Sequence, residues 1–386
     1  MGKIKILELC HFSEGICGVW NRVKEESSRL SDLGYEVRVF SSNAIKGSKG
    51  KAKSSETINK VRVKRFPYVK LGGESFMYWD FIKEALEYAP DIIIAHVYRH
   101  PHTTSALKIR KILEKKGKNC TVLLVTHAPF NNDNSESGII AKTAVKLYDF
   151  FIGRKTINKF DKVINISNWE IPYLLKLGLK RSKLFYLPNG VPEAFFKSSP
   201  PHNENNKILF LGRISPVKNL SLVILSLSKT KNYSLDITGP SEGNYKKELE
   251  SLVKSEWLNK RVSFSDPVYD LTKKIKKIDS AMLFILPSKR EGMPQSLIEA
   301  MARGRVCIGS DVEGISDLIK NKSNGFIFSL KNKESLPNLL NYISGLSKSD
   351  LKLVMKNSIE FASKFNWNMI ILKLDKLMNE ELHKRR

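Results

Sequence analysis

The chain is 386 residues long, 41% of its residues are hydrophobic, and Lys and Arg exceed Asp and Glu by 26. This length fits two domains of ordinary size, each able to bury a core. No apolar run approaches the roughly 20 residues that would span a bilayer. The positive charge is spread over both halves, so nucleic acid, an anionic membrane and a phosphorylated substrate are all open as partners. Because no zinc-finger, basic-zipper or RNP-type motif is present, we favour the membrane and expect no nucleic-acid partner.

Cysteine usage and the first residues of the chain both predict a cytoplasmic protein. The four cysteines, Cys10, Cys17, Cys120 and Cys307, lie in or near apolar runs and form no Cys-x-x-Cys pair. We therefore expect them to pack in a reducing compartment, and we expect no structural zinc bound by them. The chain opens directly on a strand pattern that contains Glu8, which is not typical of a secretory signal.

Short apolar runs alternate with helical segments through the first half, which predicts an α/β domain with a parallel sheet. The expected strands are residues 4–10, 35–40, 91–96, 121–127 and 163–167, and the expected helices are residues 20–33, 76–90, 103–117 and 169–177. Two glycines, Gly15 and Gly18, follow the first strand, where Rossmann-like units commonly bind a ligand. A plain turn accounts for two glycines equally well.

Histidines stand at the carboxyl ends of two expected strands. His96 ends one strand and His127 ends the next, and open parallel sheets bind ligands outside such ends. A hydrogen-bonded structural role is the alternative for a histidine in this position. His100 and His102 follow His96, and acceptor binding is open for these three.

Two segments combine basic side chains with features of a membrane surface. Residues 46–65 hold eight basic residues against one acid, Glu56, which predicts a solvated loop, with a membrane-facing role as the alternative. Residues 141–159 mix aromatic and aliphatic side chains with Lys and Arg, which is typical of a membrane interface and equally of a core helix with a basic outer face. Peripheral attachment to the inner face of the cell membrane is therefore open.

A polar, Pro-rich stretch within residues 191–206 predicts a linker, after which the strand–helix alternation begins again. The strands expected here are residues 207–212, 234–238, 261–265 and 281–286. Arg213 and Lys218 lie between the first of these strands and its helix. A guanidinium fork and a compact ammonium both suit phosphate. Basic residues are so common in this chain that the pair alone indicates little.

The segment from Pro287 to Gly304 predicts a strand–loop–helix unit whose helix begins at the loop. Pro294 is expected in the first helical turn, and Gly304 is expected in the left-handed conformation that ends a helix. A helix amino terminus is a ready anion site.

Two acids lie eight residues apart in this unit, Glu291 in the loop and Glu299 in the helix. Beside an anion site, acids suit only the uncharged parts of a ligand, such as sugar hydroxyls. Taken without context, the two would be a loop charge and a solvated helix face.

The string Glu-Gly-Met-Pro-Gln-Ser-Leu-Ile-Glu-Ala-Met-Ala-Arg-Gly, residues 291–304, resembles the E-x7-E signature of retaining glycosyltransferases of family 4. The resemblance covers most of the chain and is strongest from Ile208 to Phe328. It implies an α/β, GT-B fold in which two Rossmann-like domains face each other across a cleft. The implied parts are an acceptor-side domain over 1–190, a linker over 191–206, a nucleotide-sugar-binding domain over 207–360, and a helix over 361–386 that packs back on the first domain.

The resemblance also assigns roles to residues. Arg213 and Lys218 would hold the donor diphosphate, Glu291 the sugar hydroxyls and Glu299 the ribose. His127 would lie beside the donor sugar, so the implied catalytic set is Glu291, His127, Arg213 and Lys218. The remaining donor-binding positions are Gly18, Gly239, Gly292, Met293 and Pro294.

The implied activity is metal-independent transfer of a hexose from a nucleotide-diphosphate sugar to a glycan or lipid-linked acceptor. No Asp-x-Asp occurs in the chain, so no metal and no cofactor are expected. The chain departs from the family at Lys289-Arg290, where an aromatic is common, and at Arg305, often proline, which would alter the acceptor side or only the surface. The alternatives are an epimerase or phosphorylase on the same fold, and a basic nucleic-acid-binding protein.

Overall fold

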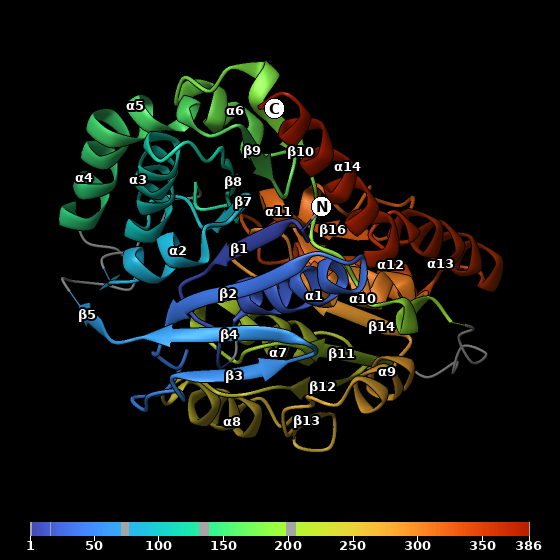
Figure 1. The fold of residues 1–386 in the computed structure, drawn as a ribbon. Helices are drawn as coiled ribbons and strands as arrows, with labels where there is room; N and C mark the ends of the chain where they lie inside the picture. The colour runs from blue at the N-terminus through green and yellow to red at the C-terminus, as the bar shows by residue number, and fades with distance from the viewer. Residues whose placement is uncertain (1, 16, 71–76, 131–138, 198–205, 386) are drawn as a thin grey trace. The chain divides into compact units, whose positions relative to one another are not determined.

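The computed structural model describes residues 2–15, 17–70, 77–130, 139–197 and 206–385. The backbone divides into two units, the first made of Met1–Asn189 and Trp367–Arg386 and the second of Gly190–Asn366. Each unit has its own parallel β-sheet with helices between successive strands, which confirms the predicted α/β class (Figure 1). Most of the expected linker, residues 198–205, lies outside the described residues.

The first unit is built on a sheet with the order β10-β9-β8-β7-β1-β2-β4-β3, parallel except for β3 against β4. Its strands are β1 (Lys5–Leu9), β2 (Glu36–Ser42), β3 (Ser55–Ile58), β4 (Val61–Phe66), β7 (Ile92–His96), β8 (Thr121–Val125), β9 (Lys162–Asn165) and β10 (Leu184–Tyr186). Every residue of β7 and β8 is buried, which explains why these strands are continuous apolar runs in the sequence. A separate antiparallel pair consists of β5 (Tyr68–Lys70) and β6 (Met77–Trp79).

The helices of the first unit are α1 (Gly18–Asp32), α2 (Ile82–Tyr88), α3 (Pro101–Lys115), α4 (Ile139–Tyr148), α5 (Arg154–Thr156), α6 (Glu170–Lys176) and α14 (Trp367–His383). The crossover from β1 to β2 runs in one direction along the sheet, and the crossover from β7 to β8 runs in the other. Because such crossovers are right-handed, α1 and α3 cover opposite faces, and the direction reverses between β1 and β7. The carboxyl-terminal helix α14 packs on α1, with Tyr35 donating a hydrogen bond to Asp375.

The second unit repeats this plan with the strand order β13-β12-β11-β14-β15-β16. Its strands are β11 (Lys207–Leu211), β12 (Ser234–Thr238), β13 (Val262–Ser265), β14 (Leu283–Leu286), β15 (Val306–Ser310) and β16 (Phe326–Phe328). Its helices are α7 (Leu220–Ser228), α8 (Tyr245–Ser255), α9 (Leu271–Asp279), α10 (Gln295–Ala302), α11 (Glu313–Ser316), α12 (Ser335–Ser344) and α13 (Lys348–Ser363). The crossover direction reverses between β11 and β14.

The predicted solvated loop over residues 46–65 is wrong for its second half, which forms β3 and β4. Val61 and Val63 alternate with outward-facing residues and are buried, so the period is that of a strand. Arg65 is buried as well, forms an ion pair with Glu56, and donates hydrogen bonds to Ser13. This basic segment can form part of the sheet because Glu56 and Ser13 compensate the buried charge of Arg65.

The predicted helix over residues 76–90 is also wrong in its first part. Met77 and Trp79 are buried while Tyr78 between them is exposed, which is the alternation of strand β6. The helix begins only at Ile82 and ends at Tyr88, before the left-handed Ala89.

Arg305 lies in the core of the second unit, so the interpretation of this family departure as a surface change is wrong. Its side chain is 1% exposed, and its guanidinium donates hydrogen bonds to the carbonyl groups of Arg303 and Ala281. Burial lowers the pKa of Arg305 below its usual value. The residue fastens the end of α10 to the start of β14.

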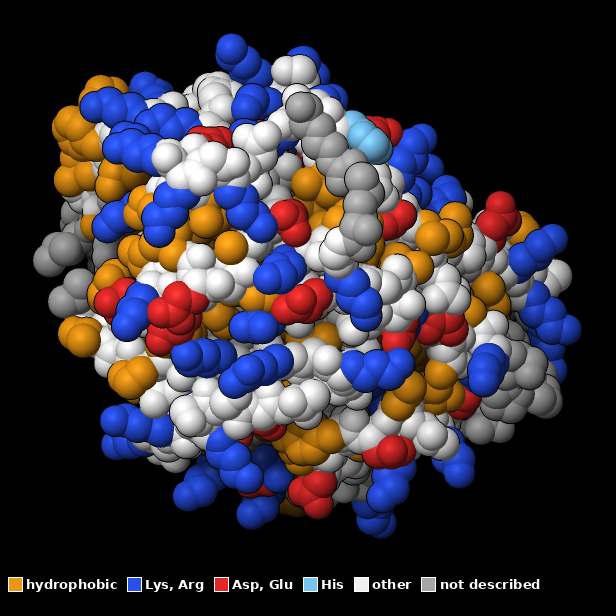
Figure 2. Space-filling view, viewed as in Figure 1, with side chains coloured by type: hydrophobic (Ala, Val, Ile, Leu, Met, Phe, Trp, Pro, Cys, Tyr) orange, Lys and Arg blue, Asp and Glu red, His pale blue; other side chains and the backbone are white. Residues whose placement is uncertain are grey.

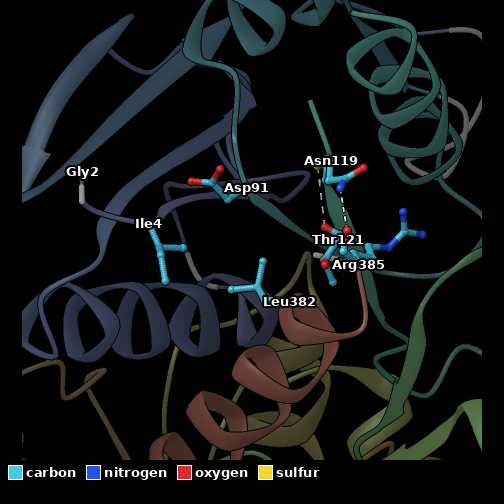
Figure 3. Close-up of a pocket in the computed structure, with 8 residues that line it drawn as sticks. Gly2, Ile4, Asp91, Asn119, Thr121, Leu382 and Arg385 are labelled. Atoms are coloured by element: carbon cyan, nitrogen blue, oxygen red, sulfur yellow. Dashed lines mark hydrogen bonds between the residues drawn. The ribbon is translucent and has the colours of Figure 1, made fainter. Parts of the chain in front are cut away.

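A pocket of about 390 Å³ lies at the amino ends of the first sheet (Figure 3). Its lining comes from the starts of β1, β7 and β8 and the end of α14: Gly2, Ile4, Asp91, Asn119, Cys120, Thr121, Leu382 and Arg385. Asn119 donates a 2.5 Å hydrogen bond to the carbonyl of Arg385 across it. Parallel strands bind ligands at their carboxyl ends, so this pocket is at the wrong edge to be the candidate active site.

Gly314 allows α11 to approach the loop after β14. A Cβ atom at this position would lie 2.4 Å from the carbonyl oxygens of both Glu291 and Gly292. Only a glycine therefore leaves that loop in place.

We expect Gly314→Ala to destabilise the second unit by about 1–3 kcal/mol, because the added methyl group overpacks against backbone atoms that cannot rotate away. Gly345→Ala is the matched control, since its nearest described atom would be 3.6 Å from the new Cβ. The control should be neutral or stabilising by up to about 1 kcal/mol. Thermal and urea unfolding measure both; equal stability of the two variants would contradict the steric argument.

Candidate active site

The second unit gathers predicted residues at the point where its crossover direction reverses. The loops after β11 and β14 are joined by a hydrogen bond of 2.8 Å from the backbone N–H of Lys289 to the carbonyl of Val217. This contact brings Lys218 beside Glu291, with Nζ 2.5 Å from Oε1. The sequence placed these residues 73 positions apart, and the sheet topology brings them together.

Glu291 is held in a fixed orientation. Its Oε1 also accepts a 2.6 Å hydrogen bond from the hydroxyl of Ser288, and the carbonyl of Ser288 accepts one of 2.6 Å from Ser310. The carboxylate is partly buried, so its ion pair with Lys218 is less screened than one on the open surface.

Arg213 occupies the same loop as Lys218 but has a different partner. Its guanidinium lies 3.5 Å from Glu242, and both side chains are about half exposed. Exposed pairs contribute little to stability, so the guanidinium can exchange this carboxylate for an anionic ligand at small cost.

Helix α10 starts one residue later than predicted. Pro294 is the residue before the helix, and the first helical residue is Gln295. The backbone N–H groups of a first helical turn have no acceptor within the helix, and together with the helix dipole they attract negative charge. Gly304 has φ +64°, as predicted for a left-handed helix end.

Glu299 is buried, so the alternative of a solvated helix face is wrong. Its exposed fraction is 6%, and Lys274 donates a 2.6 Å hydrogen bond to Oε1. Oε2 is buried without a hydrogen-bond partner among the described residues. A buried carboxylate oxygen without a donor is costly, so this atom is ready to accept a hydrogen bond from a ligand hydroxyl.

Two glycine positions differ in what requires them. Gly239 has φ +147°, and a Cβ there would be 1.9 Å from the carbonyl oxygen of Gly212, so packing of the loops after β11 and β12 demands glycine. A Cβ at Gly18, the first residue of α1, would meet no described atom within 4 Å. The protein's own packing therefore does not account for Gly18.

In the first unit a hydrogen-bonded chain runs from β1 to His127. Glu8 Oε2 lies 2.8 Å from His96 Nε2, and His96 Nδ1 lies 2.9 Å from His127 Nε2. Glu8 and His96 are fully buried, whereas His127 is half-buried. This series of hydrogen bonds ends at His127, the histidine that the sequence analysis favoured.

Burial shifts the pKa values of the side chains in this hydrogen-bonded series. It lowers the pKa of His96 and of His127 well below the usual value, so both rings are neutral near pH 7. Burial also raises the pKa of Glu8, and the neighbouring Glu26 adds to the effect. When Glu8 carries its proton, it donates to His96 Nε2, His96 Nδ1–H donates to His127 Nε2, and the proton of His127 is on Nδ1. His127 is then a neutral hydrogen-bond donor.

The turn that carries His127 is strained and is held by a buried acid. His127 and Ala128 both have positive φ, +59° and +55°, which is uncommon for residues with a Cβ. Glu170 accepts hydrogen bonds from Thr126 Oγ1 at 2.5 Å and from the N–H of Ala128 at 2.9 Å. Its other oxygen accepts two backbone N–H groups from the strand-end turn after β9.

Sequence reasoning missed four residues that support this site: Glu8, Arg22, Glu26 and Glu170. All are completely buried. Arg22 pairs with Glu26 at 2.9 Å and donates hydrogen bonds to the carbonyl groups of Leu187 and Pro188. The available signal was a charged residue inside an apolar strand, and an i, i+4 Arg–Glu pair on the apolar side of a helix.

Comparisons with known proteins agree with this geometry. Residues 16–195 match the family described as Glycosyltransferase Family 4, and residues 192–358 match Glycosyl transferases group 1. The chain is 26% identical over 261 residues to a UDP-Gal:alpha-D-GlcNAc-diphosphoundecaprenol alpha-1,3-galactosyltransferase of Escherichia coli, covering 62% of this chain and 64% of that protein.

Solved structures share the whole fold. A glycosyltransferase from Rickettsia africae ESF-5 superposes with a TM-score of 0.76 at 18% identity, covering 99% of both chains. Anabaena HepE, in complex with UDP and glucose, superposes with a TM-score of 0.73 at 18% identity, covering 98% of this chain and 100% of that one. With both halves matched in order and the predicted motif residues assembled at the switch point of the second sheet, the chain belongs to glycosyltransferase family 4 and has the GT-B fold.

Proposed function

We propose that this glycosyltransferase moves a hexose from a uridine-diphosphate sugar to a lipid-linked acceptor, with retention of configuration and without a metal ion at the diphosphate. The observation that carries the site assignment is the Lys218–Glu291 pair beside the start of α10. The proposal for the donor is supported by HepE, whose structure holds UDP and glucose. The proposal for the acceptor is supported by the E. coli relative, which is named for a diphosphoundecaprenol acceptor.

Three positive elements would bind the diphosphate: Arg213, Lys218 and the amino terminus of α10. Negative charge develops on the leaving diphosphate as the glycosidic bond breaks, and donors fixed in advance stabilise that charge without reorganisation. Arg213 and Lys218 would supply the compensation that a metal ion gives in other glycosyltransferases.

The sugar and the ribose would meet different acids. Glu291 would accept hydrogen bonds from hydroxyls of the donor sugar. For His127 the family resemblance implies donation from Nδ1 to a sugar oxygen. Glu299 would accept a ribose hydroxyl on Oε2, the oxygen without a partner among the described residues.

A panel of UDP, GDP and ADP sugars in thermal-shift assays tests the donor, because a ligand stabilises the folded protein by mass action. We expect the UDP sugars to raise Tm most. Turnover of the donor without any acceptor would instead indicate an epimerase.

The two acids of the motif should differ in kinetics. We expect Glu291→Gln to lower kcat by roughly 10²–10³, since its contacts strengthen as the sugar becomes cationic. Glu299→Gln should chiefly raise the donor KM, because ribose contacts are equal in the ground and transition states. Steady-state kinetics at several donor concentrations separate these effects, with Tm as the folding control. Unchanged kinetics in both variants would refute the assignment.

The strained turn should act through His127. We expect Glu170→Gln to lower kcat, because Glu170 accepts on both carboxylate oxygens, from Thr126 and Ala128 on one and from Ile166 and Ser167 on the other, whereas an amide has a single acceptor oxygen. His127→Gln should lower kcat more. A double-mutant cycle is the measurement: if Glu170 only positions His127, the double variant should be no slower than His127→Gln alone. Additive losses would mean that Glu170 contributes independently.

An apolar patch on the first unit supports attachment to a membrane. Its members are Leu147, Phe150, Phe151 and Ile152, which are 41–56% exposed. The same segment carries Lys142, Lys146, Arg154, Lys155 and Lys159. Figure 2 shows hydrophobic side chains bordered by Lys and Arg where Figure 1 places α4 and α5. The other side of this stretch packs on the core, where Ile157 is fully buried and Tyr148 contacts the core cluster.

The charge at the patch is positive because Asp149, the acidic residue of this segment, is paired with Arg99. Asp149 forms a bidentate pair with Arg99, with distances of 2.9 and 2.6 Å. The guanidinium of Arg154 lies 5.3 Å from the ring centroid of Phe150. Exposed aromatics next to cations suit the headgroup region of an anionic bilayer. Across the described residues, no helix is both long and apolar enough to pass through a bilayer.

We expect the protein to bind vesicles that contain anionic lipid and to dissociate at high salt. Exchanging both Phe150 and Phe151 for Ser should weaken binding roughly 10–100-fold, because two partly inserted rings lose their apolar transfer free energy. Tyr269→Ser is the matched control, since that side chain is 73% exposed in the second unit. Vesicle flotation is the measurement. Equal binding to neutral and anionic vesicles would contradict the proposal.

A further inference from the structure

Three histidines of the first unit form a buried cluster outside the proposed donor-binding set. His11 follows β1, His100 immediately precedes α3, and His102 is in the first turn of α3. All three are at most 9% exposed, and one ring nitrogen from each lies within 4.8 Å of those of the other two. The cluster sits at the carboxyl ends of β1 and β7, where the crossover direction of this sheet reverses.

The hydrogen bond made by His102 determines which kind of ligand the cluster can take. His102 Nε2 lies 2.7 Å from the backbone carbonyl oxygen of His96. A carbonyl oxygen only accepts, so Nε2 carries the proton and the neutral ring has a bare lone pair on Nδ1. Nδ1 is buried without a hydrogen-bond partner among the described residues. A lone pair repels an anion and attracts a cation.

His100 adds a second buried ring nitrogen. Its Nδ1 is also buried with no hydrogen-bond partner in the described part of the chain. Neutral imidazole is the form that binds a metal.

The ring positions match those of a three-histidine metal centre. The centroid of His11 lies 4.7 Å from that of His100 and 6.0 Å from that of His102, and the last two are 5.5 Å apart. With zinc–nitrogen bonds of about 2.0–2.1 Å and tetrahedral angles, two imidazoles on one zinc have centroids roughly 5 Å apart. Small side-chain rotations would bring one nitrogen of each ring within bonding distance of a single zinc ion.

The second coordination shell is of the usual kind. Metal-bound histidines commonly donate their other N–H to a backbone carbonyl, as His102 does to His96. The amino terminus of α3 and the nearby Lys46 oppose a cation. The helix-dipole effect is small beside three metal–nitrogen bonds.

We propose that His11, His100 and His102 form a zinc site that ties the loop after β1 to the start of α3. Three imidazoles leave the fourth tetrahedral position for water or another oxygen ligand. Imidazole nitrogen selects zinc and its neighbouring transition metals over magnesium and calcium. This site belongs to the first unit, whereas Arg213 and Lys218 belong to the second, so it is consistent with a diphosphate held without metal.

Metal content of the full chain tests the proposal. The protein is stripped with EDTA, incubated with Zn²⁺ alone, passed through gel filtration and analysed by elemental mass spectrometry. We expect one equivalent of zinc on the wild type and none on His100→Gln, whose side chain makes no cap hydrogen bond to α3 that the change could break. His383→Ala, which removes an exposed histidine, should still retain one equivalent.

Cobalt and a ligand-preserving variant complete the test. Co²⁺ bound to the wild type should show the intense visible bands of a tetrahedral centre. His100→Cys should restore zinc and add a sulfur-to-cobalt charge-transfer band. If the wild type retains no zinc, or if His100→Gln retains as much as the wild type, the site does not exist. Neither measurement depends on transfer activity, so the result is independent of the proposed function.

Discussion

The right-handedness of strand–helix–strand crossovers is the constraint on which the rest of this structure depends. In each sheet the crossovers start at neighbouring strands and run in opposite directions, so the helices cover opposite faces and the two loops between them diverge. Polar groups can gather there without disturbing either core. Lys218 meets Glu291 at this point in the second unit, and His96 meets His127 near it in the first.

Buried charge is what makes the first unit specific. Arg22 and Glu26 form a buried ion pair in an otherwise apolar region, and removing either partner would leave an uncompensated ion. Nearby, Glu8 fixes His96, and Glu170 fixes the turn that follows β8. Backbone strain is retained here: the left-handed His127 and Ala128 persist because buried hydrogen bonds hold them.

The exposed patch and the candidate active site depend on different interactions. Leu147, Phe150 and Phe151 remain outside the core although they are among the most hydrophobic residues of their segment. Their neighbours are mostly cations, and the face in Figure 2 shows Lys and Arg scattered widely over the rest of the surface. Positive charge is found over the whole of this face, so the patch is distinguished by having exposed apolar side chains next to the positive charge.

The sequence by itself determined the α/β class, the strand–loop–helix unit at Pro287–Gly304 and the family, because fully buried strands and helix ends leave local patterns. It could not decide which charges are buried. Glu170 and Arg305 look like ordinary surface residues in the sequence, and only long-range contacts removed them from water. For the same reason β4 was read as a loop: Arg65 is tolerated inside only because Glu56 and Ser13 reach it from other strands and turns. Tertiary structure alone supplied those partners.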